Sequence, residues 1–425
     1  MLTRAPKGTK DILPSESYSW QYVEEKIRQI ARLYGYREIR TPIFEHTDLF
    51  VRSVGDTTDI VQKEMFTFED KGKRSITLKP EGTAGVVRAY IEHSLYAEPQ
   101  PIKVYYITPC FRHERPQAGR QRQFNQFGVE VFGGKEASLD AEIISLAVKL
   151  FDSLAIKGLK VNLNSIGCPD CRGPYHEKIK EYLGDNINSL CKSCSDRYEK
   201  NPLRILDCKE EGCKALVAGI PLILDNLCDE CKDHFDQVKA FLDAKGIDYQ
   251  INPLIVRGLD YYTKTVFEII SDSLGAQSTV CGGGRYDGLV EECGGPKTPG
   301  IGFAIGLERL MMILEAQKAI DIIEEPMDIY IATIGDMARL KASDLISVLR
   351  EKGISADMDH VGRSIKAQFK YAGKQGYKFV CTIGENELTT GDLRIKNMKE
   401  GKEDSIRIES LLDYLIKQLG GSSND

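Results

Sequence analysis

Two strand-like runs, residues 103–112 and 124–132, are joined by an arginine-rich loop, and this unit constrains the fold more than any other feature. Such a pair is typical of an antiparallel hairpin, and a connecting loop this long is usually functional. Because side chains alternate along a strand, Gln126, Gly128 and Glu130 share one face and the opposite face is apolar. A solvent-exposed polar face is the common alternative. We expect the apolar face to pack on a core and the polar face to contact a ligand, with Gly128 leaving room for it.

The loop of this hairpin carries Arg112, Arg115, Arg120 and Arg122, and Glu114 is its only acid. Arginine presents a rigid fork of donors that suits phosphate oxygens, so several converging arginines predict a polyanion site. The chain has no GxxxxGK[ST] motif, and phosphates would therefore be held by side chains and magnesium rather than by a P-loop. The alternative is a solvated basic turn.

At 425 residues the chain is long enough for two or three domains. Within the first part, periodicity predicts a helix over 20–34 that Gly35 closes, and Thr83 starts a second helix. Residues 255–270 read as sheet, 281–288 as a glycine cluster, and 299–314 as a turn running into an apolar helix. We expect residues 1–325 to form one domain, interrupted at about 168–245 by an inserted helical module.

Residues 326–425 form a separate α/β domain by prediction, because strand patterns at 327–335, 354–359 and 378–384 alternate with helix patterns at 337–352 and 364–374. No acid lies between Asp359 and Glu385, whereas basic residues recur at steps of three and four, on one helical face: Arg363, Lys366, Lys370 and Lys374. A basic stripe attracts a phosphate backbone, although a solvated helix face is its usual meaning. The net charge of −6 therefore does not exclude a nucleic-acid partner.

Eight of the twelve cysteines lie in the inserted module, in four pairs: Cys168 and Cys171, Cys191 and Cys194, Cys208 and Cys213, Cys228 and Cys231. Nineteen residues separate the first pair from the second, which fits a tetrahedral zinc template, so one site could use Cys168 to Cys194 and another Cys208 to Cys231. Interleaved pairing is equally compatible. No histidine set typical of an open catalytic site accompanies them, which favours structural zinc, one ion or two.

The N-terminus has no apolar region typical of a signal peptide, and no apolar stretch approaches the roughly 20 residues of a membrane helix. We expect a cytoplasmic protein with reduced thiols.

The residues quoted above resemble a known family. FRHERPQAGRQRQF (111–124) resembles motif 2 of class II aminoacyl-tRNA synthetases in the form that histidyl-tRNA synthetases use. EIRTPIFE (38–45) is similar to motif 1, which forms the dimer interface in the family, and GIGFAIGLERL (300–310) to motif 3. RGLDYYTKTVFEI (257–269) and GGGRYDGL (282–289) are similar to the two histidine-specific motifs. The resemblance runs from KGTKDILP, near the N-terminus, to the last helix.

The resemblance implies an α+β catalytic domain on an antiparallel sheet and a C-terminal α/β anticodon-binding domain. It implies a ligase that joins L-histidine to tRNA(His) through histidyl-adenylate, uses ATP with Mg²⁺, and forms a homodimer. Carried over by motif, Arg112 and Arg257 would be catalytic; ATP would contact Arg112, Glu114, Arg120 and Arg309; histidine would contact Glu81, Thr83, Gln126, Glu130, Arg257, Tyr261, Tyr262 and Tyr286. Core packing is the alternative for the tyrosines, and a helix N-terminal acid the alternative for Glu81.

Metal-binding cysteines depart from the family, whose inserted domain usually needs no metal and approaches the tRNA acceptor arm. Three other functions compete with this one. A regulatory subunit of histidine biosynthesis related to histidyl-tRNA synthetases typically lacks the C-terminal domain that this chain has. An enzyme for another amino acid would lack the two histidine-like motifs, and a non-catalytic zinc-containing RNA-binding protein would leave Gln126 and Glu130 unexplained.

Overall fold

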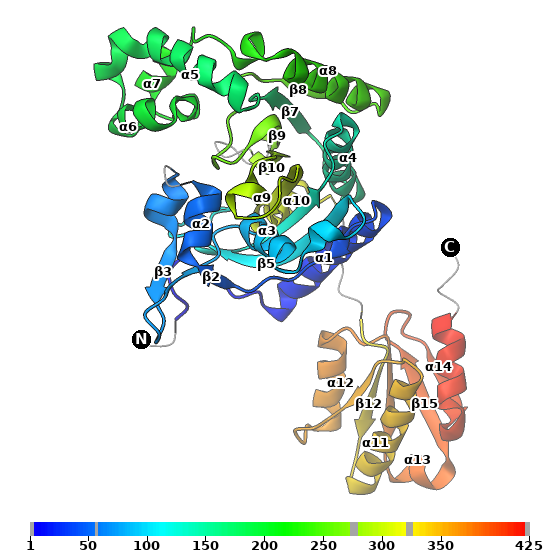
Figure 1. The fold of residues 1–425 in the computed structure, drawn as a ribbon. Helices are drawn as coiled ribbons and strands as arrows, with labels where there is room; N and C mark the ends of the chain where they lie inside the picture. The colour runs from blue at the N-terminus through cyan, green and yellow to red at the C-terminus, as the bar shows by residue number, and fades with distance from the viewer. Residues whose placement is uncertain (1–3, 56–57, 273–278, 320–325, 421–425) are drawn as a thin grey trace. The chain divides into compact units, whose positions relative to one another are not determined.

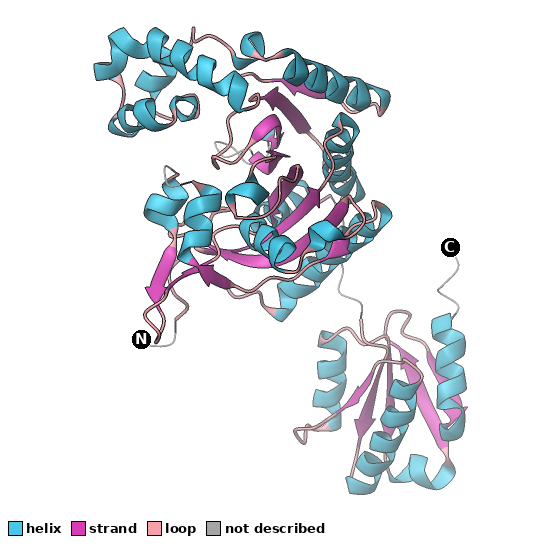
Figure 2. Cartoon of the chain, viewed as in Figure 1, coloured by secondary structure: helices cyan, strands magenta, loops and turns pink. Residues whose placement is uncertain are grey.

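The computed structural model describes residues 4–55, 58–272, 279–319 and 326–420. Its contacts divide the chain into two units, Met1–Ile322 and Ile323–Asp425. Helices and strands alternate in the second unit, whereas the first combines a large sheet with a helical segment (Figures 1 and 2). Among the described residues, no helix has both the length and the apolar character needed to cross a membrane.

The first unit is built on an eight-stranded sheet in the order β1-β5-β6-β11-β10-β9-β7-β8. The central pairs are antiparallel, and only β1 with β5 and β7 with β8 run parallel. The predicted hairpin is β5 (Ile102–Phe111) with β6 (Gln123–Phe132), within a residue of the expected bounds. The fold class is thus confirmed as an antiparallel-rich sheet.

One face of this sheet packs on the main core. Phe127, Val129 and Val131 of β6 are fully buried there, as the alternation predicted. Four helices cover this face with their apolar sides: α1 (Pro14–Leu33), α4 (Ala137–Ser153), α8 (Asp229–Ala244) and α10 (Leu307–Gln317). Burying this many aliphatic and aromatic side chains is the main stabilising term of the unit. The opposite face of the same strands is left for the site.

Two sequence readings in this unit were wrong. The predicted turn at the start of 299–314 is the strand β11 (Gly300–Gly306). It pairs with β10 (Thr279–Arg285), which contains most of the glycine cluster, so these glycines lie in the middle of the sheet. The sheet-like run at 255–270 becomes a strand only at β9 (Thr263–Ser271). Residues 255–262 form an irregular segment, since Ile255 N–H bonds the Asn252 carbonyl in a turn and Asp260 N–H bonds the Val54 carbonyl.

The remaining strands and helices of the unit extend or flank the sheet. β1 (Arg37–Glu38), β7 (Leu159–Ser165) and β8 (Tyr249–Ile251) complete it. β2 (Phe44–His46), β4 (Ser75–Leu78) and β3 (Phe66–Glu69) form a separate three-stranded sheet, accompanied by α2 (Thr47–Val54), α3 (Thr83–Glu92) and α9 (Leu289–Glu292). The helical module consists of α5 (Pro169–Leu183), α6 (Lys192–Lys200), η4 (Pro202–Ile205), α7 (Glu211–Val217) and the start of α8 (Figure 1).

The second unit has a five-stranded sheet in the order β13-β12-β14-β15-β16. Alternate residues of β12 (Ile329–Thr333) face two cores, one under α11 (Asp336–Glu351) and α14 (Leu411–Gly420), the other under α12 (Ile365–Lys374). β13 (Ala356–Met358) and β14 (Phe379–Ile383) pair parallel to β12 as the alternation predicted. The strands β15 (Asp392–Asn397) and β16 (Glu403–Arg407) and the helix α13 (Glu385–Thr390) were not foreseen.

Candidate active site

Small residues form the floor of the site. Strand register aligns one row across five strands, in the order Tyr106, Gly128, Ala304, Gly282 and Glu268. The middle three have at most a methyl group, so the centre of this face is nearly bare backbone between a tyrosine and a carboxylate. A ligand or a neighbouring side chain can therefore lie flat on the sheet.

Three of the glycines are needed because side chains already occupy the space above them. A Cβ on Gly302 would lie 2.0 Å from Oε2 of Glu130, and one on Gly282 would lie 2.1 Å from Nη2 of Arg257. A Cβ on Gly128 would lie 2.3 Å from the Tyr106 ring. The expectation that Gly128 leaves room for a ligand was therefore wrong: the room is filled by Tyr106, which the sequence reading had not singled out.

Glu130 is almost completely buried, at 1% exposure, and three hydroxyl groups donate to it. Its Oε1 accepts from Thr83 Oγ1 at 2.7 Å and from Tyr106 at 3.2 Å, and its Oε2 accepts from Tyr286. Burial raises the pKa of Glu130 to about 8, because desolvation disfavours the charged form more than the hydroxyl groups favour it. The result is a preformed, polar and nearly dry position at one end of the site.

The N-terminus of α3 supplies the neighbouring polar groups. Glu81 is buried, and its carboxylate accepts the backbone N–H groups of Thr83 and Ala84, both at 2.8 Å. Glu81 thus has the helix N-terminal position given as its alternative role, while its side chain also lines the cavity. Gln126 Oε1 accepts the Gly82 N–H at 2.9 Å, which leaves the amide nitrogen of Gln126 available to other partners.

Arg257 and three tyrosines form the wall beside Glu130. Arg257 pairs with Glu268, and its buried Nε has no hydrogen-bond partner among the residues that the structure describes. The rings of Tyr261 and Tyr262 lie 4.7 Å apart and those of Tyr261 and Tyr286 lie 5.6 Å apart. All three tyrosines are buried, as the core-packing alternative predicted, and all three also line the cavity.

Arginines line the other end of the site. Arg112 donates through Nε to the Pro80 carbonyl at 2.8 Å, and Arg120 lies 3.1 Å from the Glu114 carboxylate. Arg309, in the first turn of α10, donates to the carbonyls of Gly119 and Thr279. This end is more open, with 22% of the Arg112 side chain and 35% of the Arg120 side chain exposed.

The four loop arginines do not converge as a group. Arg112 and Arg120 line the cavity, whereas Arg115 is exposed outside it and Arg122 donates to the Glu114 carbonyl. The two hairpin strands fix only the ends of the loop. The turn from Gln117 to Arg120 sets the direction of the residues between them. At this end the cavity is therefore lined by two loop arginines together with Arg309 from the first turn of α10.

A single cavity of about 480 Å³ joins the two ends. Twelve expected site residues line it: Glu81, Thr83, Arg112, Glu114, Arg120, Gln126, Glu130, Arg257, Tyr261, Tyr262, Tyr286 and Arg309. Asp207, Lys209, Glu268 and Glu308 line it as well and were not expected. Glu268 could have been found from its place on the β9 face, whereas Asp207 and Lys209 enter from the inserted module, which no local pattern indicates.

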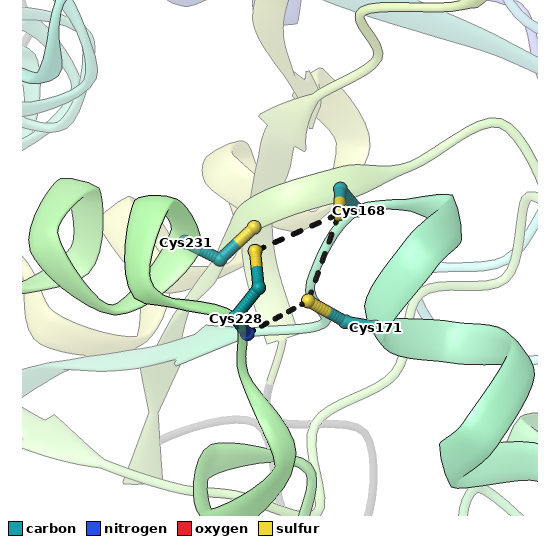
Figure 3. Close-up of side chains that lie close together, drawn as sticks. All are labelled: Cys168, Cys171, Cys228 and Cys231. Atoms are coloured by element: carbon teal, nitrogen blue, oxygen red, sulfur yellow. Dashed lines mark hydrogen bonds between the residues drawn. The ribbon is translucent and has the colours of Figure 1, made fainter.

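The eight cysteines of the module gather in two groups, and in each the sulfur atoms all lie within 4.8 Å of one another. The first group, Cys168, Cys171, Cys228 and Cys231, joins the starts of α5 and α8, with the side chains turned toward one another (Figure 3). The second is Cys191, Cys194, Cys208 and Cys213. The sequence left the combination of the pairs open, and these two groups exclude the consecutive combination. The outer pairs combine and enclose the inner ones, because the starts of α5 and α8 meet where the module leaves the sheet.

The sulfur spacing fits tetrahedral zinc. Zn–S bonds of about 2.3 Å place the sulfurs of a tetrahedron about 3.8 Å apart. Cys168 Sγ lies 3.6 Å from Cys171 Sγ and 4.0 Å from Cys228 Sγ, and Cys191 Sγ lies 3.8 Å from Cys208 Sγ. All twelve cysteines of the chain are free thiols. The donor set and its dimensions therefore suit a soft divalent ion in both groups.

In the second unit, Lys366, Lys370 and Lys374 are exposed on α12. Arg363 is not on the helix, since α12 begins at Ile365. Its guanidinium pairs with Asp359 at 2.8 Å and lies over the Tyr371 ring. The predicted stripe thus has three exposed lysines, and its fourth charge is balanced by a carboxylate.

The chain is similar to known proteins along most of its length. A family model described as histidyl-tRNA synthetase matches residues 8–169 and 209–310, and one described as anticodon binding domain matches residues 328–418. The interruption at 170–208 covers much of the cysteine-rich module.

Two curated relatives match along nearly the whole chain. The histidine–tRNA ligase of Caldanaerobacter subterraneus subsp. tengcongensis is 57% identical over 412 residues, 97% of this chain and 99% of the relative. That of Clostridioides difficile is 56% identical over 422 residues, 99% of this chain and 100% of the relative. The crystal structure of apo S. aureus histidyl-tRNA synthetase superposes with a TM-score of 0.84 at 42% identity, covering 97% of this chain and 100% of that one.

Proposed function

Because this chain belongs to the histidyl-tRNA synthetase family, it attaches histidine to tRNA, and we propose the roles that its side chains take in that reaction. The histidine carboxylate attacks the α-phosphorus of ATP, which forms histidyl-adenylate and releases pyrophosphate. The terminal ribose hydroxyl of tRNA(His) then attacks the activated carbonyl and releases AMP. A regulatory subunit of histidine biosynthesis is less well supported, since curated ligases match nearly the full length.

One observation carries the proposed roles: a buried carboxylate with hydroxyl partners lies at one end of a cavity whose other end is lined by arginines. We assign the imidazole of histidine to the Glu130 end. Glu130 accepts an imidazole N–H, while Tyr262 and Tyr286 contact the ring. A site built to hydrogen-bond a ring N–H rejects amino acids without one, because its own polar groups would stay unpaired.

The α-ammonium group of histidine belongs beside the start of α3. Glu81, Thr83 and Gln126 offer a carboxylate, a hydroxyl and an amide within one small region. Tyr261 supports this wall from behind through its ring contacts.

The phosphates of ATP belong at the arginine end. Arg112 and Arg257 approach the α-phosphate from two sides and stabilise the charge that develops there, which is the main contribution a protein makes to such a displacement. Arg120 and Arg309 contact the outer phosphates and Glu114 the adenine amino group. Mg²⁺ would neutralise part of the phosphate charge when ATP binds.

The exposed lysines of α12 suit the phosphate backbone of tRNA, and the match of residues 328–418 to an anticodon binding domain supports that assignment. We also assign a homodimer from the motif 1 resemblance, and the cytoplasm from the free thiols. Each cysteine group holds one structural Zn²⁺, which metal analysis of the purified protein would detect as two ions per chain.

Amino-acid-dependent exchange of pyrophosphate into ATP tests the function directly. Histidine should stimulate exchange, the other nineteen amino acids should not, and charging of tRNA(His) should follow. Exchange with another amino acid in preference to histidine would refute the substrate assignment. No exchange at all, in a folded protein with its zinc, would refute the activation step.

A further inference from the structure

The second cysteine group lies next to the catalytic cavity. Cys208, one of its four members, stands between Asp207 and Lys209, and both of these neighbours line the cavity. A metal ion held by Cys208 would therefore fix the backbone of the cavity wall within one residue on either side, although the metal itself would take no part in the reaction.

Residues 201–204, in the same connection between α6 and α7, also contact the segment that carries Arg257 and Tyr262. Arg204, only 6% exposed, donates to the Gly258 carbonyl at 3.2 Å and lies 3.7 Å from the Asp260 carboxylate. Asn201 donates to the same carboxylate at 2.9 Å. Because residues 255–262 form no strand, side-chain bonds of this kind help to position them, together with Arg172 to the Tyr262 carbonyl at 3.1 Å and Asn164 to the Ile255 carbonyl at 3.0 Å.

The stretch between α6 and α7 has little regular structure of its own. Between α6 and α7 the chain forms only the four-residue η4, and its backbone is fixed by single contacts such as Arg197 to the Arg204 carbonyl at 3.2 Å. The apolar residues Leu203, Ile205 and Leu206 pack in a small cluster that includes Cys194 and Cys213. Cores this small usually need a metal or a cross-link to hold one conformation.

We propose that Cys191, Cys194, Cys208 and Cys213 bind one Zn²⁺, and that this centre positions the histidine-activating cavity through the Arg204 contact to residues 258–260. The inference rests on the proposed function, since it concerns the same cavity, but it makes the activation step dependent on a metal that touches neither substrate. Arg204 is accordingly a positioning residue.

The test compares two substitutions at one ligand in the full-length protein. Cys191 is half-buried, so an imidazole has room there, and histidine is an accepted zinc ligand whereas serine is a poor one. Cys191→His should keep two zinc ions per chain and wild-type exchange. Cys191→Ser should keep one zinc ion. Its KM for histidine should rise about tenfold, with kcat changed less than KM, because the displaced segment carries Tyr262, which is assigned to the histidine ring. Lys214→Ala, exposed on α7 beside Cys213, is the control and should equal the wild type.

A second variant removes the link and keeps the metal. Arg204→Ala should retain two zinc ions yet show a similar rise in KM, and combining it with Cys191→Ser should add little, because both changes interrupt one connection. Fully additive losses would overturn the positioning role. If Cys191→Ser does not fold, Arg204→Ala alone decides: wild-type KM in this variant overturns the proposal.

The outcomes separate this inference from the proposed function. Absence of histidine-dependent exchange in the wild-type protein refutes the function. Normal exchange by a Cys191→Ser protein that has lost one zinc ion refutes the inference alone, as does a wild-type protein whose second group binds no zinc.

Discussion

The two ends of the catalytic cavity differ in how completely they are formed before substrates bind. At the histidine end, Glu130 is 1% exposed and already accepts three hydroxyl donors. At the phosphate end, Arg120 pairs with Glu114, the residue assigned to adenine, and 35% of its side chain is exposed. Under the proposed roles, ATP replaces existing ion pairs, whereas histidine enters a preformed site.

The difference follows from the elements that carry each end. Glu130 and Gln126 project from the central strand β6, while Arg112 and Arg120 lie on the loop between β5 and β6. Polar groups held by rigid strands reject wrong substrates strongly, because an unmatched buried group is costly. Arginines on a loop can follow a flexible polyphosphate. Selectivity for the amino acid is thus assigned to the sheet, and binding of ATP to the loop.

Arg257 stands between the two ends, and its loss should have the largest effect. Arg257→Ala removes a guanidinium assigned to the α-phosphate and leaves Glu268 without its partner, so exchange kcat should fall by about 10³. Steady-state pyrophosphate exchange measures this, with Arg257→Lys as the charge-preserving comparison, which should recover part of the rate. A decrease below tenfold would remove Arg257 from the catalytic residues.

Glu130→Gln tests the preformed end. The amide has the same shape but accepts only through one oxygen, so the KM for histidine should rise by about 10² while the KM for ATP stays within about twofold. Exchange measured while varying each substrate separates the two constants. Equal losses for both substrates would contradict the assignment of the imidazole to Glu130.

Arg120→Ala tests the adaptable end, with Arg115→Ala as the matched control from the same loop. Removing one charge-assisted contact to an outer phosphate should raise the KM for ATP about fivefold to tenfold and leave the KM for histidine unchanged. Arg115 is exposed outside the cavity, so its substitution should change neither constant. A comparable effect from both variants would indicate general electrostatics rather than a specific contact.

The pH dependence of stability gives the smallest effect. Burial raises the pKa of Glu130 to about 8, above its ordinary value, so the native state binds the proton more tightly than the unfolded state does. This contribution is fully present below the ordinary pKa and is lost as pH rises toward 8. Between pH 6 and 7.5 the wild type should lose about 2 kcal/mol relative to Glu130→Gln, seen as a few degrees in the difference of their Tm values. A difference that moves in the opposite direction would contradict the raised pKa of Glu130.

Local periodicity was sufficient for much of the site. The alternation in β6 placed Gln126 and Glu130 on the correct face, and the family motifs named twelve residues that line one cavity. It failed where the structure depends on distant partners. Gly302 falls in the predicted turn because nothing local shows that it lies in a strand beneath Glu130. The pairing of the cysteines stayed open for the same reason, since the starts of α5 and α8 meet only in the folded chain.

The bare floor of the cavity has a consequence for how such an enzyme can evolve. A methyl group at Gly302 would collide with Glu130 and with the Val129 carbonyl, and one at Gly128 would collide with the Tyr106 ring, so neither glycine can be replaced without displacing its neighbours. A new amino-acid specificity could not arise there through single substitutions that each preserve activity. The glycines of the floor therefore preserve the present amino-acid specificity, because single variants at these positions would lose activity. A change of specificity has to begin with the side chains of the cavity walls.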